Sequence, residues 1–162
     1  MTPVAQPVFP DPVASAAKLA AYLEHSIPLV RHMALHVASL DERALTLAAP
    51  LAPNSNHIGT AFGGSLNGLA TLACWGLVWV LLEPVAPNQI VIRESRMRFL
   101  VPVTGDFTAV APLPARDTLD AFVKAFLRRG RARLALEARV LQNEKVAAEF
   151  NGEFVALRLG SP

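Results

Sequence analysis

Hydrophobic positions recur with a helical period in two segments of the chain. The first covers residues 13–25 and ends before Pro28, because the residue that precedes a proline is disfavoured in the helical conformation. The second covers residues 117–130 and has an acidic first residue, two arginines in its last turn and a terminal glycine. The pattern therefore predicts one helix near the amino terminus and one in the carboxy-terminal half.

Elsewhere hydrophobic and polar positions alternate, which indicates half-buried strands. Turn residues at Asp41-Glu42, Thr104-Gly105 and Asn143-Glu144 would join these strands into three antiparallel hairpins. The six expected strands cover about residues 33–37, 45–47, 90–101, 106–111, 132–140 and 146–154.

An uninterrupted apolar segment lies between the first two expected hairpins. Residues 63–82 contain no Asp, Glu, Lys or Arg and are long enough to cross a bilayer. The polar Ser65, Asn67 and Thr71 within the segment, and the lack of a basic cluster at either end, favour instead a helix enclosed by a sheet. We expect an α+β fold in which the sheet curls around this helix, and no membrane span.

Composition predicts one domain that associates with itself. The 162 residues are 52% hydrophobic and only 17% charged, which leaves little polar surface to cover a monomer. We expect a flexible, Pro-rich start at residues 1–13 without a signal peptide, followed by one domain at residues 14–162. Cys74 is the only cysteine, which is typical of the reducing cytoplasm and, within the apolar helix, of an inert buried thiol.

Charge is unevenly distributed along the chain. Residues 93–139 contain ten basic and five acidic residues, a local excess of +5 in a chain of net charge +2. Such a stretch could dock an acidic partner or a phosphate, or form the solvated face of ordinary strands. We expect no nucleic-acid partner, because no helix-turn-helix, aromatic RNA platform or zinc spacing accompanies the charge.

The candidate chemistry lies in residues 54–65, Asn-Ser-Asn-His-Ile-Gly-Thr-Ala-Phe-Gly-Gly-Ser, which lead directly into the apolar helix. A turn rich in Asn and Gly at a helix start offers unpaired backbone N–H groups and the positive end of the helix dipole. The N–H groups of Gly63 or Gly64, with a carboxamide from Asn54 or Asn56, would hold an anion or a developing oxyanion.

The same residues resemble a known signature. Residues 56–64 are similar to the Asn-x-x-Gly-Thr-x-His-Gly-Gly signature of hotdog-fold acyl-thioester hydrolases. A closer resemblance, over about residues 20–157, is to the thioesterase-like carboxy-terminal domain of the YiiD family. The shared features are Ile27-Pro28-Leu29, Pro53-Asn54-Ser55-Asn56, residues 59–66, Trp75-Gly76-Leu77, Arg98-Phe99 and Pro102.

The resemblance implies a hotdog fold, in which a curved antiparallel sheet wraps a central helix. It also implies acyl groups carried as thioesters of acyl carrier protein or coenzyme A, and a homodimer or dimer of dimers with sites at the subunit interface. Some members resemble malonyl-acyl carrier protein decarboxylases that prime fatty-acid synthesis. We expect no metal and no cofactor. The spacing of Asn56 to Gly59 matches the hydrolase signature, so Asn56 is favoured over Asn54 as the substrate-facing carboxamide.

Residue types help to choose between these activities. Hydrolysis needs a base that activates water. In hydrolases with the signature, an Asp often occupies the position aligned with Thr71, and their histidine is replaced here by Phe62. Decarboxylation of a malonyl thioester needs no activated water, because the departing carbon dioxide leaves an enolate whose charge sits on the thioester oxygen. We therefore favour a malonyl-thioester decarboxylase, with an acyl-thioester hydrolase or a non-catalytic acyl-carrier binding module as alternatives.

Further residues are expected to line the substrate pocket. Phe62 or Trp75 would supply an apolar wall that disfavours the malonyl carboxylate. The spacing of Asn67, Thr71 and Cys74 predicts one shared helix face, whose only ionisable group is the thiol. The expected substrate-binding residues are Phe62, Ser65, Asn67, Thr71, Trp75, Arg96 and Arg98.

A base could still come from another part of the chain. His57, Glu94 and Asp106 are the candidates. Their simpler interpretations are a solvated loop histidine, an ion pair with a neighbouring strand arginine, and a turn residue, respectively.

Overall fold

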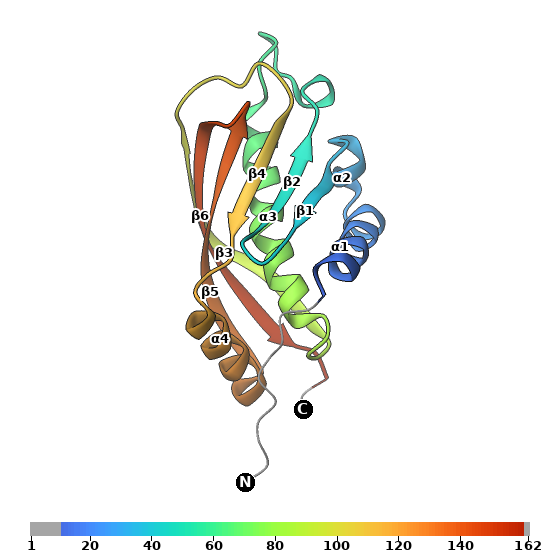
Figure 1. Cartoon of the computed structure of the whole chain (residues 1–162), viewed down its shortest axis with the longest axis vertical. Helices are drawn as coiled ribbons and strands as arrows, with labels where there is room; N and C mark the ends of the chain where they lie inside the picture. The colour runs from blue at the N-terminus through green and yellow to red at the C-terminus, as the bar shows by residue number, and fades with distance from the viewer. Residues whose placement is uncertain (1–10, 161–162) are drawn as a thin grey trace.

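Six antiparallel strands form one sheet that curves around a central helix, α3 (Gly63–Leu82) (Figure 1). The computed structural model describes residues 11–160, so most of the flexible start expected at residues 1–13 lies outside the described residues. The strands are β1 (His36–Leu40), β2 (Ala44–Ala49), β3 (Asn88–Phe99), β4 (Phe107–Pro112), β5 (Arg131–Gln142) and β6 (Lys145–Arg158). Their order in the sheet is β1-β2-β4-β5-β6-β3, and the predicted α+β architecture is confirmed.

The central helix is mostly apolar, and the sheet encloses most of it. α3 contacts β2, β3, β4, β5 and β6, and three phenylalanines on the inner face of the sheet, Phe107, Phe150 and Phe154, are almost completely buried. Burial of each such side chain stabilises the fold by about 1.5–3 kcal/mol. By length and composition α3 could cross a membrane, but 67% of its most apolar stretch is buried inside the domain, as in a core helix.

Three shorter α-helices complete the fold of residues 11–160. α1 (Pro12–Ser26) is capped by Asp11, whose carboxylate accepts the Val13 N–H at 3.0 Å. α4 (Arg116–Arg129) ends at Gly130 in the left-handed conformation, as the sequence predicts. α2 (Pro28–His32) begins with a proline, which suits the first turn of a helix. The strand expected from residue 33 begins only at His36, because residues 33–34 form the turn that follows α2.

The predicted hairpin across Thr104-Gly105 is wrong. β3 pairs with β6, whereas β4 pairs with β2 and β5. The segment between β3 and β4 instead crosses the end of the sheet near the start of α3 (Figure 1). It is held there because the Ala61 N–H donates to the Val103 carbonyl at 2.8 Å, and the Thr104 N–H donates to Gln142 at 2.8 Å.

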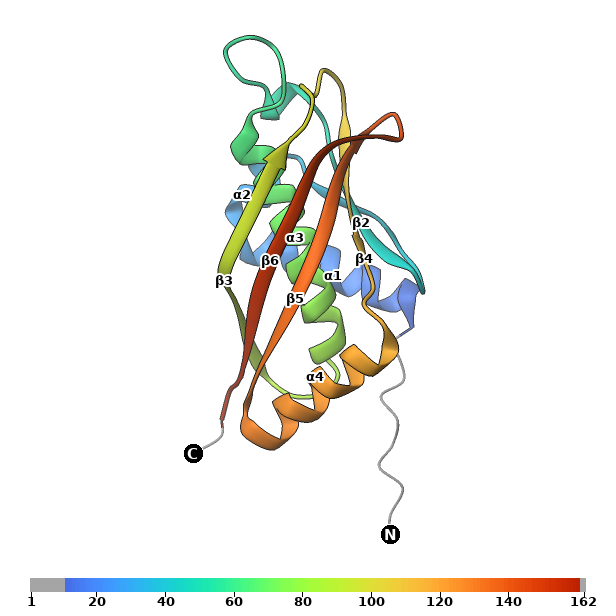
Figure 2. The ribbon, with the colours of Figure 1, turned by 90° about the vertical axis from the view of Figure 1, so that its left-hand side faces the viewer.

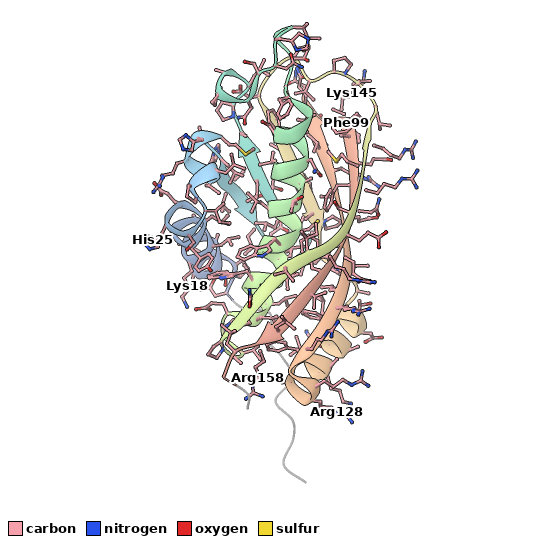
Figure 3. All side chains as sticks on the ribbon, turned by 180° about the vertical axis from the view of Figure 1, so that it is seen from behind. Lys18, His25, Phe99, Arg128, Lys145 and Arg158 are labelled. Carbon is pink, nitrogen blue, oxygen red and sulfur yellow. The ribbon has the colours of Figure 1, made fainter. Side chains whose placement is uncertain are left out.

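β3 is an edge strand that runs antiparallel to α3 (Figure 2). Near the start of β3, the Trp75 indole N–H donates to the Ile90 carbonyl at 3.1 Å. At the other end of the strand, the ring of Phe99 lies against Gly63, the first residue of α3. The free edge of β3 therefore accompanies one side of α3 over most of its length, and that side is seen in Figure 3.

Candidate active site

The loop between β2 and α3 is held in shape by its own hydrogen bonds. A single 3₁₀ turn, η1 (Ala52–Asn54), leads into an isolated bridge between Ser55 and Ala61. Gly59 has a φ of 80°, a left-handed conformation that glycine adopts at little cost. The loop is thus a fixed turn that ends directly on α3.

Asn56 closes this turn with its side chain. Its Oδ1 accepts the N–H groups of Ile58 at 3.0 Å and Thr60 at 3.1 Å, and its Nδ2 donates to the Thr60 hydroxyl at 2.8 Å. One amide hydrogen of Asn56 remains without a partner among the described residues. The carboxamide is therefore fixed in orientation and retains a hydrogen that a ligand could accept.

Asn54 is buried behind the loop, with only 2% of its surface exposed. Its Nδ2 donates both hydrogens, to the carbonyls of Met33 at 2.9 Å and Pro50 at 2.8 Å. Its backbone carbonyl accepts the Phe62 N–H at 2.7 Å. Asn54 therefore ties the end of α2 to the start of α3, and it has no amide hydrogen left for an oxyanion.

Both asparagines thus bond to the backbone, and the two carboxamides differ in what they can still donate. The preference for Asn56 as the substrate-facing residue stays a prediction, which the spare hydrogen of Asn56 supports. The Oδ1 atom of Asn54 is buried and has no hydrogen-bond partner among the described residues.

The start of α3 presents two unbonded N–H groups. The Ser65 and Leu66 N–H groups bond to the Phe62 carbonyl at 2.9 and 3.1 Å, so those of Gly63 and Gly64 have no partner within residues 11–160. They point along the positive end of the helix dipole. The ring of Phe62 lies over Gly64, and Ser65 is half-buried in the same turn. This arrangement can hold negative charge beside an apolar wall.

Gly64→Ala should disturb this wall without unfolding the chain. A Cβ atom at residue 64 would lie 2.2 Å from the ring of Phe62, which is 58% exposed and free to move aside. We expect Tm to stay close to that of the wild type and turnover to fall about tenfold or more, because the wall is displaced from the reacting group. Gly63→Ala is the matched control, since its Cβ would meet Phe99 at an ordinary 3.4 Å. Equal turnover losses in both variants would contradict this assignment of Phe62.

Asn67, Thr71 and Trp75 follow one another at four-residue intervals on α3 and are half-buried. Cys74 follows Thr71 by three residues and Asn67 by seven on the continuous helix α3, so it shares their side of the helix as predicted, but unlike them it is fully buried. Burial raises the pKa of the Cys74 thiol far above its ordinary value, so the thiol is inert, as expected. The uncovered side of α3 therefore carries no ionisable side chain from Asn67 to Trp75.

An aromatic cluster lies further along the same side of α3. Tyr22 of α1 stacks on Trp75, with ring centroids 5.9 Å apart, and contacts Trp79 at 5.1 Å. These rings line a pocket of about 410 Å³ beside the start of β3. The spacing of four residues from Trp75 to Trp79 could have indicated the second ring, but only the fold brings Tyr22 to them.

Arg96 and Arg98 do not come together with the loop. They project from the outer face of the sheet, since Met97 between them packs against the core and the Arg98 guanidinium contacts Glu149 on β6 at 3.4 Å. Arg96 lines a separate open hollow of about 560 Å³ on that face. Their role as substrate ligands stays a prediction.

None of the three candidate bases forms a hydrogen bond or an ion pair with residues 62–66 within the described part of the chain. The Asp106 carboxylate accepts the Leu51 N–H at 2.9 Å and acts as a turn residue. His57 is exposed in the loop. Glu94 makes no ion pair among the described residues, because Arg93 pairs instead with Glu153 at 2.6 Å and lowers the pKa of that carboxyl.

The sheet, the enclosed helix and the glycine-rich helix start define a hotdog-fold protein. The family described as "Putative thioesterase (yiiD_Cterm)" matches residues 16–158. The chain therefore belongs to this thioesterase family.

Solved structures agree with this assignment. A protein of unknown function from Chlorobaculum tepidum TLS is 35% identical, with a TM-score of 0.85 over 91% of this chain and 96% of that chain. A Shewanella oneidensis protein, described as a "putative thioesterase", is 28% identical, with a TM-score of 0.80 over 90% of this chain and 99% of that chain. A thioesterase from Haemophilus influenzae, 17% identical with a TM-score of 0.71 over 90% of this chain and 92% of that chain, shares the fold.

Proposed function

We propose that this protein decarboxylates a malonyl thioester of acyl carrier protein, or of coenzyme A, to the acetyl thioester. One observation carries the proposal: the start of α3 offers hydrogen-bond donors and apolar rings, whereas α3 itself, residues 63–82, carries no Asp, Glu or His that could deprotonate water. The donors are the N–H groups of Gly63 and Gly64 and the spare amide hydrogen of Asn56. Such groups stabilise a developing oxyanion by ~2.7–4 kcal/mol for each well-placed donor.

The reaction follows from what these groups can hold. The bond between the malonyl methylene carbon and its carboxylate breaks, and the electron pair forms an enolate whose charge lies on the thioester oxygen. The donors bind that oxygen, while Phe62 and Phe99 disfavour the charged carboxylate in the starting thioester. Carbon dioxide leaves, and the methylene carbon takes a proton from water to give the acetyl group.

Hydrolysis of an acyl thioester is the second candidate, and the family description favours it. Mass spectrometry after incubation with malonyl-acyl carrier protein distinguishes decarboxylation from hydrolysis. A decarboxylase yields acetyl-carrier with the thioester intact, whereas a thioesterase yields the free carrier thiol. Recovery of unchanged malonyl-carrier and unchanged medium-chain thioesters would overturn both and leave a binding module.

We infer further that two copies associate through the free edge of β3. The edge strand has 12 residues, and an unpaired edge of this length readily pairs with another chain. Exposed apolar side chains line it and the neighbouring loop, which is typical of an interface. They are Ile58, Phe62, Val91, Ile92, Phe99 and Leu100. This arrangement would place the start of α3 at the interface.

Ile92→Lys should therefore prevent association. Ile92 is 40% exposed near the middle of β3, so a two-fold axis there brings the two introduced ammonium groups close together. We expect sedimentation to show a monomer at concentrations where the wild type is a dimer, with a parallel loss of turnover. Ser39→Lys, on the opposite edge strand β1, is the matched control. A dimeric Ile92→Lys variant would exclude this edge as the interface.

A further inference from the structure

The backbone brings four exposed arginines to one corner of the molecule, where α4 passes into β5. Arg128 and Arg129 form the last turn of α4, and Arg131 begins β5 after the left-handed Gly130. Arg158 of β6 joins them, because its N–H donates to the Gly130 carbonyl at 2.8 Å. We call these four residues the arginine corner. Figure 3 shows Arg128 and Arg158 at the same end of the molecule.

The arginine corner is electrostatically unbalanced. No carboxylate within residues 11–160 forms an ion pair with any of its guanidinium groups. The segments 121–136 and 154–160 contain no Asp or Glu at all. Ordinary strand and helix surfaces intersperse both signs of charge, as the outer face of β3 and β6 does through Arg93-Glu153 and Arg98-Glu149. The corner is therefore suited to an acidic partner.

Two exposed leucines accompany the charges. Leu127 on α4 is 46% exposed, and Leu159, which follows Arg158, is 50% exposed. The core of a protein interface is more apolar than the rest of the surface, and arginine is enriched there. The phosphates of a nucleotide would make no use of the leucines, so the combination favours an acidic protein surface as the partner.

Within one copy, the arginine corner cannot serve the candidate active site. It lies at the end of the molecule opposite Phe99 and the start of α3 (Figure 3). The two ends are separated by the length of α3, whose 20 residues span ~30 Å at 1.5 Å per residue.

In a two-fold pair through β3, the edge strands run antiparallel, so the start of one strand lies beside the end of the other. Asn88 at the start of β3 pairs with Arg158 of the arginine corner, and Phe99 at its end lies beside Gly63. The corner of one copy therefore comes next to the active-site loop of the other.

We propose that the arginine corner of one copy docks the acidic carrier protein whose thioester reacts at the loop of the other copy. This proposal rests on the proposed function and on the β3 dimer. The carrier would contact the guanidinium groups through its carboxylates, while its thioester arm reaches the unbonded N–H groups of Gly63 and Gly64.

The test compares a carrier-bound substrate with a small one. The double variant Arg128→Glu/Arg129→Glu, and separately Arg158→Glu, should lower kcat/KM for malonyl-acyl carrier protein about tenfold relative to kcat/KM for malonyl-pantetheine, mainly through KM. Arg43→Glu, in the turn between β1 and β2, is the control that makes the same charge change as Arg158→Glu elsewhere on the surface. An unchanged ratio in the corner variants, or an equal change in Arg43→Glu, would overturn the proposal.

A binding measurement keeps this test independent of turnover. Fluorescently labelled holo-acyl carrier protein should bind the wild-type dimer with an affinity that falls with salt, and the corner variants should bind about tenfold more weakly with a flatter salt dependence. Absence of turnover with normal, corner-dependent binding would refute only the proposed reaction. Equal binding by wild type and corner variants would refute the docking surface.

Mixed dimers test whether the corner acts on the other copy. Co-expression of Asn56→Ala with Arg128→Glu/Arg129→Glu, at carrier concentrations well below KM, should restore about a quarter of wild-type activity. Half of the dimers are mixed, and one of the two sites in each mixed dimer has both an intact Asn56 and an intact arginine corner. A quarter of all sites is therefore fully functional. Activity no higher than the mean of the two parent variants would show that the corner does not act in the partner.

Discussion

Asn56→Asp is expected to lose turnover by about 10²-fold or more while the loop keeps its conformation. A carboxylate at residue 56 can still accept the N–H groups of Ile58 and Thr60, and the Thr60 hydroxyl can donate to it in place of the amide. What disappears is the spare amide hydrogen, and a negative charge now faces the developing oxyanion. The measurement is kcat with malonyl-acyl carrier protein, together with Tm.

Asn54→Ala supplies the contrast to this variant. It leaves the buried carbonyls of Met33 and Pro50 without their donor, which costs ~1–3 kcal/mol of unfolding free energy. We expect a clear drop in Tm and a smaller loss of kcat than in Asn56→Asp. Near-normal turnover in both variants would mean that the oxyanion is not held in this loop, and the mechanism would fail.

The regular elements are predictable where one physical signal dominates. The alternation along β5 and β6 reflects a sheet with one face on the core, and the apolar run of α3 reflects a helix enclosed by that sheet. Gly130 marks the end of α4 because its left-handed conformation suits glycine. These features depend on local sequence and on burial alone.

The hairpins β1–β2 and β5–β6 form as predicted, but the partners of β3 and β4 were not predictable in the same way. Thr104 and Gly105 are ordinary turn residues, yet the segment between β3 and β4 bonds to Ala61 and Gln142, which are distant in sequence. A turn that joins two paired strands and a loop that crosses the end of a sheet can have the same residue composition. Only the contacts at the end of the sheet decide between them.

The site was predictable in part for the same reason. Its donors lie together in sequence, in residues 54–65, so a single motif reveals them. Arg96 and Arg98 flank Met97, whose inward position places both arginines on the outer face, and strand alternation could have indicated this separation from the loop. Phe99 and Tyr22 reach α3 from other elements, which the sequence alone does not bring near it.

Thr71→Asp is expected to convert the site toward hydrolysis. Thr71 is half-buried on the uncovered side of α3, between Asn67 and Trp75, where no ionisable side chain lies. A carboxylate there could accept a proton from water, and a positioned general base contributes ~10²–10⁴-fold to such a step. We expect release of free thiol from acetyl-acyl carrier protein to rise about 10²-fold. Decarboxylation should fall, because the added charge opposes the enolate.

Thr71→Asn is the matched control for this variant, since it has the same shape and no basicity. Thiol release by Thr71→Asp should decline as the pH falls through the pKa of the new carboxyl, because only the ionised form accepts a proton. The Asn variant should show neither the gain nor this pH dependence. Equal thiol release by the two variants would mean that residue 71 does not face the reacting carbonyl. In that case the lack of a base at residue 71 could not explain why the protein decarboxylates rather than hydrolyses its substrate.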